Sequence, residues 1–83
     1  MKIVKSQDMC TSIPVHRILR TTVEKKEDNR WIITATVEHD RPVTLARYPS
    51  DELAIAMDVK MWISDADVFI FPTSDMAARG LER

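Results

Sequence analysis

The sequence predicts an α+β domain in which a small antiparallel sheet of about four or five strands packs on one main helix, residues 51–63. Apolar and polar residues alternate over residues 31–38, which is typical of a strand with one buried face. From Pro49 onward the apolar spacing changes to about 3.6 residues, the period of a helix. We assign residues 1–72 to this single domain and residues 73–83 to a polar, mobile C-terminal tail.

Five segments have the β-branched or alternating apolar content of strands. They are residues 2–5, 15–25, 30–38, 43–48 and 68–72. The polar residues 39–42 form a turn, so the third and fourth segments pair as an antiparallel hairpin. Another polar turn, residues 26–29, joins the second segment to this hairpin. Because neither face of the second segment is cleanly apolar, a bulge there would reset its register.

The junction between the last hairpin strand and the helix has specific residues. Tyr48 precedes a proline and is therefore biased toward an extended backbone. Ser50 can cap the helix through its hydroxyl. Asp51 and Glu52 then place negative charge in the first turn, where the helix dipole favours it.

The helix is apolar on two opposite sides. One side contains Leu53, Ala54, Met57 and Met61, and the other contains Ile55, Val59, Trp62 and Ile63. A chain of this size has one sheet to offer as cover, so we expect the second side to meet another copy of the protein. Two alternatives stay open. The two sides of the helix could be exchanged, or residues 68–71 and the tail could cover the second side.

Composition argues against several classes of protein. Twelve basic and thirteen acidic residues give a formal net charge of −1, so there is no overall electrostatic footprint for nucleic acid. The single cysteine, Cys10, excludes an intramolecular disulfide and fits a reducing compartment. No apolar run has the length of a signal peptide or a membrane span. We therefore expect a cytoplasmic protein without a membrane partner.

Residues with catalytic or metal-binding chemistry are sparse. His16, His39 and Cys10 lack the spacing of metal ligands or of a nucleophile with its base. The acidic pair in residues 65–67 could offer carboxylates to Mg²⁺, but such pairs usually solvate a loop. Gly80 is the only glycine, which excludes a glycine-rich phosphate loop. We expect no enzyme activity, no metal and no cofactor.

The arginines are the better candidates for binding. If Arg20, Arg41 and Arg47 converge in the fold, they could hold a phosphate-bearing ligand or an acidic protein surface through bidentate contacts. The alternative is a solvated sheet face with cross-strand pairs such as Arg47 with Glu38.

The chain resembles a group of short uncharacterised proteins of bacteria and their phages. The shared pattern is an L-a-x-Y-x-s-x-e-x-A strand-to-helix junction followed by a closing apolar strand that ends in proline. It maps onto Leu45, Ala46, Tyr48, Ser50 and Ala54, with residues 69–72 at the end. The resemblance brings no catalytic residue, and it implies a protein that acts by binding and blocking another molecule.

Three functions follow from these observations. The preferred one is a small non-enzymatic oligomeric binding or inhibitory protein, phage-encoded and directed at a bacterial defence system. Its target would be a protein such as a CRISPR effector, or a signalling nucleotide held by arginines. The second is a nucleic-acid-associated accessory protein, against which the near-neutral charge counts. The third is a small enzyme with a composite site at a subunit interface, formed by His16 or His39 with a carboxylate.

Overall fold

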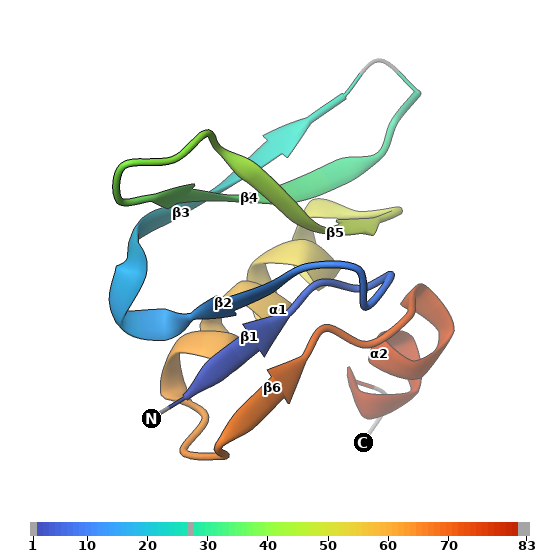
Figure 1. Ribbon diagram of the computed structural model, residues 1–83. Helices are drawn as coiled ribbons and strands as arrows, with labels where there is room; N and C mark the ends of the chain where they lie inside the picture. Colours follow the sequence, from blue (N-terminus) through green and yellow to red (C-terminus); the bar gives the residue numbers. More distant parts are fainter. Residues whose placement is uncertain (1, 27, 82–83) are drawn as a thin grey trace.

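The computed structural model describes residues 2–26 and 28–81, and it confirms the α+β class (Figure 1). Met1, Glu27 and residues 82–83, parts of the predicted domain start, turn and tail, lie outside the described residues. The prediction of one sheet with four or five strands was wrong, because the described strands form two sheets of three. The larger sheet has the order β3 (Ile18–Lys25), β4 (Trp31–Val37), β5 (Val43–Tyr48). The smaller has the order β2 (Ser12–Pro14), β1 (Ile3–Lys5), β6 (Val68–Ile70).

The larger sheet is an antiparallel meander built from the predicted hairpin and the strand before it. Trp31 lies opposite Tyr48, and the register shifts by one residue between Ile33 and Thr34. The segment predicted as a strand over residues 15–25 begins instead with a 3₁₀ turn, Val15–Arg17. A bulge follows, because Ile18 and Arg20 pair with successive residues of β4 and leave Leu19 without a partner there. The bulge explains why neither face of this segment is cleanly apolar in the sequence.

The smaller sheet exists because residues 6–14, which lie between the first two predicted strands, contain a further strand. β2 pairs antiparallel with β1, with Val4 opposite Ile13, and β6 pairs parallel with β1. The tight loop between β1 and β2 is held by Ser6, whose hydroxyl donates to Asp8 and accepts from the Thr11 N–H. A strand of three residues with a single buried apolar side chain leaves almost no periodic signal.

The main helix, α1 (Asp51–Ile63), packs on the inner face of the larger sheet with one of its two apolar sides. Leu53, Met57 and Met61 are buried in the core. Ser50 is the N-cap as predicted, since its hydroxyl accepts the Leu53 N–H at 3.2 Å. At the other end, Lys2 Nζ donates to the carbonyls of residues 61 and 64 at 2.6 and 2.7 Å, where the helix dipole favours a cation.

The segment expected as a polar tail forms a second helix, α2 (Ser74–Leu81), within the described residues. Its Ala77 is buried in the core, so this segment is part of the packed structure. The junction before α2 is fixed by Pro72, whose carbonyl accepts from the Tyr48 hydroxyl at 2.8 Å and from Gln7 Nε2 at 3.0 Å. Among the side chains of α2 that the structure describes, only the small one of Ala77 is buried in the core, and so the sequence pattern of α2 was easily taken for a tail.

Figure 1 shows α1 below the larger sheet, with the strands of the smaller sheet in front of it. One core cluster joins the two sheets and α1, with Val4, Ile33 and Met61 among its fully buried members. Among residues 2–26 and 28–81, no helix combines the length and the apolar character needed to cross a membrane.

Candidate functional site

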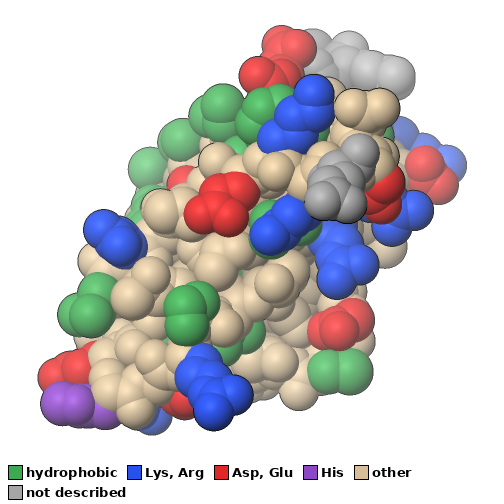
Figure 2. Space-filling model, turned by 90° about the horizontal axis from the view of Figure 1, so that it is seen from above, with side chains coloured by type: hydrophobic (Ala, Val, Ile, Leu, Met, Phe, Trp, Pro, Cys, Tyr) green, Lys and Arg blue, Asp and Glu red, His purple; other side chains and the backbone are tan. Residues whose placement is uncertain are grey.

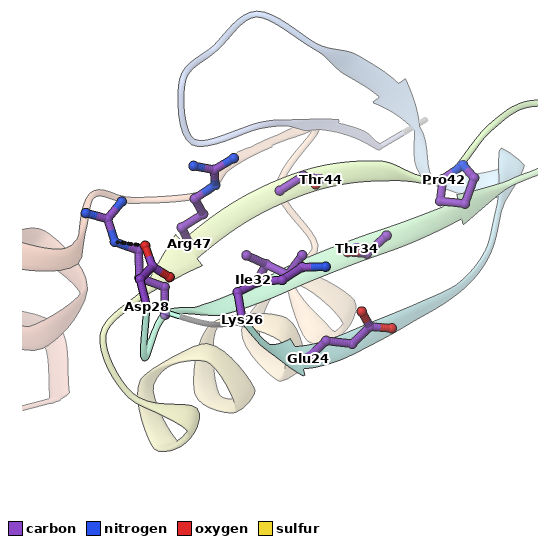
Figure 3. Close-up of a pocket in the computed structure, with 9 residues that line it drawn as sticks. Glu24, Lys26, Asp28, Ile32, Thr34, Pro42, Thr44 and Arg47 are labelled. Carbon is purple, nitrogen blue, oxygen red and sulfur yellow. Dashed lines mark ion pairs between the residues drawn. The ribbon is translucent and has the colours of Figure 1, made fainter.

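A hollow of about 860 Å³ lies on the outer face of the larger sheet, the face turned away from α1 (Figure 3). All three strands and the turn between β3 and β4 contribute to it. The lining residues are Glu24, Lys26, Asp28, Arg30, Ile32, Thr34, Pro42, Thr44 and Arg47. Figure 3 shows Arg47 and Asp28 at one end, Pro42 at the other, and Ile32, Thr34 and Thr44 between them. We call this hollow the outer groove.

The floor of the outer groove is apolar at Ile32. Successive residues of a strand point to opposite faces, so Ile32 and Ile33 lie on opposite sides of β4. Ile33 belongs to the core cluster under α1, whereas Ile32 does not. Even so, Ile32 is only 7% exposed, because the other residues of the groove surround it. A bound side chain would therefore meet an apolar surface there, flanked by the hydroxyls of Thr34 and Thr44.

Charged side chains gather at one end of the outer groove. Three are cationic, namely Lys26, Arg30 and Arg47, and the carboxylates of Glu24 and Asp28 lie among them. Arg30 Nε is 3.3 Å from Asp28 Oδ2, and both side chains are well exposed to solvent. Arg47 forms no ion pair with any residue that the structure describes. It is therefore available to a ligand carboxylate or phosphate.

Figure 2 views the molecule from above Figure 1 and shows Lys and Arg side chains interspersed with Asp and Glu on this side. The face is thus not a broad basic surface of the kind that tracks a nucleic-acid backbone.

Of the three arginines that could bind a ligand together if they converged, the outer groove contains one. Arg47 projects from β5 into the outer groove, but Arg20 on β3 and Arg41 in the turn after β4 do not line it. Arg47 lies opposite Ile32 in the ladder, so the alternative pair with Glu38 is not formed either. Sequence reasoning missed Arg30 as the second arginine of the groove. The sequence did not contain the signal, since the predicted turn would place Trp31 opposite Ser50, whereas the observed pairing with Tyr48 places Arg30 beside the end of β5.

Arg47 also borders two smaller hollows beside the outer groove. One is lined by Gln7, Asp8 and residues 44–46 of β5, and the other by Gln7, Arg30, Tyr48, Pro49 and Ser74. Hydrogen bonds from the Ser6 hydroxyl and the Cys10 N–H lower the pKa of the Asp8 carboxyl, which keeps a negative charge at that rim. Arg47 therefore borders all three hollows.

Residues with catalytic potential do not assemble in the described part of the chain. His16, His39 and Cys10 are all exposed. His39 Nε2 lies 3.5 Å from Glu38 Oε1, its neighbour in the same turn. Among residues 2–26 and 28–81, no three His, Cys, Asp or Glu side chains form a group that could hold a metal ion. Asp58 accepts a hydrogen bond from the Thr21 hydroxyl.

The four residues predicted as an oligomer interface lie on the solvent side of α1. Their side chains are 42–77% exposed. They are Ile55, Val59, Trp62 and Ile63. We call them the outer face of α1. Trp62 is held in place, because its indole N–H donates to Thr21 Oγ1 at 2.9 Å while the same hydroxyl donates to Asp58 at 2.7 Å. The choice between the two sides of the helix is thereby settled.

No family model matches the chain, and neither a curated protein nor a solved structure matches it. The resemblance to short bacterial and phage proteins therefore rests on the junction residues 45–54 and the closing strand alone.

Proposed function

We propose that this protein is a small non-enzymatic binding protein that holds an acidic segment of another polypeptide in the outer groove. The observation that supports it best is the combination of a buried apolar floor at Ile32 with Arg30 and Arg47 at one end. Guanidinium groups bind carboxylates in bidentate fashion, and an extended peptide presents alternate side chains to a strand surface.

A polypeptide fits the outer groove better than a nucleotide or a nucleic acid. None of the nine lining residues is aromatic, so a base has no ring to stack on. The groove also holds two carboxylates. A peptide can place its acidic side chains at the arginines and neutral side chains beside these carboxylates, whereas a polyphosphate carries negative charge on every phosphate. The mixed charge of the face and the net charge of −1 also argue against a nucleic-acid partner.

An inhibitory role is the form of binding that the strand-to-helix junction favours, because the similar short proteins are expected to act by blocking a target. The target would then be a component of a bacterial defence system that exposes an acidic segment. The binding chemistry proposed for the groove does not depend on which component this is.

The test compares two arginines that differ in their relation to the groove. The probe is a fluorescent ten-residue peptide with glutamate and leucine in alternating pairs, so that an extended chain presents both kinds of side chain on one face. Binding is followed by anisotropy. Arg47→Ala should raise the dissociation constant about tenfold, or about 1.4 kcal/mol, because it removes a charge-assisted contact. Arg41→Ala is the matched control, since Arg41 is an exposed arginine outside the groove, and it should leave binding unchanged.

Two further probes distinguish the other ligand classes. A cyclic dinucleotide and a single-stranded oligonucleotide of equal length should both bind more weakly than the peptide. Equal effects of the two arginine substitutions would show that the peptide responds only to overall charge, and the proposal would then be wrong. Tighter binding of the oligonucleotide, with a steep loss of affinity in salt, would favour the nucleic-acid alternative.

A further inference from the structure

β3 presents a long outer edge to solvent. It is the longest strand, with eight residues, and it pairs only with β4. The opposite edge of the same sheet is covered. There, the Gln7 N–H donates to the Leu45 carbonyl at 2.7 Å, and the Arg47 N–H donates to Gln7 Oε1 at 3.0 Å. Long unpaired edges are the usual place where a sheet accepts a strand from another chain.

The pairing of β3 with β4 determines which backbone N–H and C=O groups of β3 point away from the sheet. The Lys26 N–H donates to the Arg30 carbonyl at 2.7 Å, so the backbone of Lys26 faces β4. Residues of an antiparallel ladder face their partner strand alternately, so the even-numbered residues back to 20 also face β4. The peptide groups of Thr21, Val23 and Lys25 therefore face outward. In the described part of the chain, these three make no backbone hydrogen bond beyond the sheet.

We propose that this edge pairs with β3 of a second copy, antiparallel, about a two-fold axis at Thr22. This register joins the outward peptide groups of Thr21 to those of Val23 of the partner subunit, and the reverse pair repeats the contact. It also places Arg20 opposite Glu24 of the partner subunit, twice in the dimer. All four of these charged side chains are exposed and lie on the outer face.

Charge selects this register over its neighbours. An axis at Thr21 places Arg20 opposite Thr22 of the partner subunit and leaves the charge of Glu24 unmatched. An axis at Val23 places Arg20 opposite Lys26 of the partner subunit, which is a like-charge pair. Of these three axes, only the one at Thr22 brings opposite charges together on both sides of the dyad. Charge complementarity therefore favours this register over its two neighbours.

The same axis brings the outer face of α1 toward its counterpart. The Thr21 hydroxyl holds both Asp58 and Trp62, so this part of α1 lies under the edge of the sheet, one residue from the axis. Trp62 is 42% exposed in the single chain and would meet the partner beneath the joined strands. The contact shares Glu24 with the outer groove, whereas Arg20 does not line the groove and Arg47 belongs to β5 at the far side of the sheet. Arg20→Glu therefore tests the dimer without changing a residue of the groove, and Arg47→Ala tests peptide binding without changing β3.

The experiment is a charge reversal followed by sedimentation equilibrium at micromolar concentration. The native protein should have about twice the 9.6 kDa of one chain. Arg20→Glu and Glu24→Arg should each weaken the dimer at least about tenfold, because each places like charges opposite one another. The double reversal restores the opposite charges and should restore the native dissociation constant. Arg41→Glu, outside β3, is the control that should leave the mass unchanged.

Circular dichroism tests whether each variant is folded. We expect folded variants, because the side chains of Arg20 and Glu24 are exposed. A native protein that remains a single chain over the whole concentration range would overturn the proposal. So would a dimer that is unaffected by the single reversals, or one that the double reversal fails to restore, because either result places the interface elsewhere.

Discussion

Tyr48 should resist ionisation for as long as the protein is folded. Its side chain is 1% exposed, and its hydroxyl donates to the Pro72 carbonyl at 2.8 Å. Burial raises the pKa of the Tyr48 phenol above its ordinary value of 10.0. Because the native pKa lies above the unfolded one, the stabilising effect is fully present below about pH 10 and is lost as the pH rises toward the native pKa. In that window the free energy of unfolding should fall by about 1.4 kcal/mol per pH unit from this group.

The assay uses the fact that Tyr48 is the only tyrosine in the chain. Phenolate absorbance therefore reports Tyr48 alone, and far-ultraviolet circular dichroism reports the fold. Both signals should change together, above pH 10. Tyr48→Phe is the control. It should cost about 0.5–1.5 kcal/mol at neutral pH through the lost hydrogen bond, and should remove the part of the alkaline slope that Tyr48 contributes. Phenolate formation near pH 10 in a protein that is still folded would refute the reasoning.

Two further predictions concern α1. Ser50→Ala should lower the free energy of unfolding by about 0.5–2 kcal/mol, because the Leu53 N–H loses its cap, and an unchanged urea midpoint would contradict the assignment. Met57→Ala should cost about 2–5 kcal/mol, since Met57 is 3% exposed, whereas Val59→Ala on the outer face should change the unfolding free energy of a single chain by less than about 0.5 kcal/mol. Similar costs for the two would mean that the sides of the helix are wrongly assigned.

The larger sheet and α1 were predictable because their residues repeat a pattern long enough to recognise. The alternation in β4 and the change of period at Pro49 each extend over several residues, and Ser50 marks the start of the helix. The smaller sheet was not predictable, since β2 buries only Ile13 and its pairing with β1 depends on the loop held by Ser6. Strands of three residues form because of such tertiary contacts, and these contacts cannot be recognised from the local sequence pattern.

The candidate site was not predictable from alternation. A strict period of two would place Arg47 on the same face as Leu45, which is buried in the core. A register shift, in which Ile33 pairs with Ala46 but Thr34 pairs with Thr44, puts Arg47 on the outer face instead. Its neighbours in space could not be obtained in this way, because Arg20 and Arg41 are placed by the bulge in β3 and by the turn after β4. The burial of Ile32 on the outer face was equally hidden, since alternation alone predicts an exposed residue there.

The most direct test of the central claim is to map the peptide onto the folded chain by amide chemical shifts in nitrogen-15-labelled protein. The glutamate–leucine peptide should shift the amides of Ile32, Thr34, Thr44 and Arg47, which surround the outer groove, and these shifts should disappear in Arg47→Ala. The amides of Val59 and its neighbours on the outer face of α1 should stay in place. Shifts confined to α1 or to β6, with the outer groove unchanged, would contradict the account.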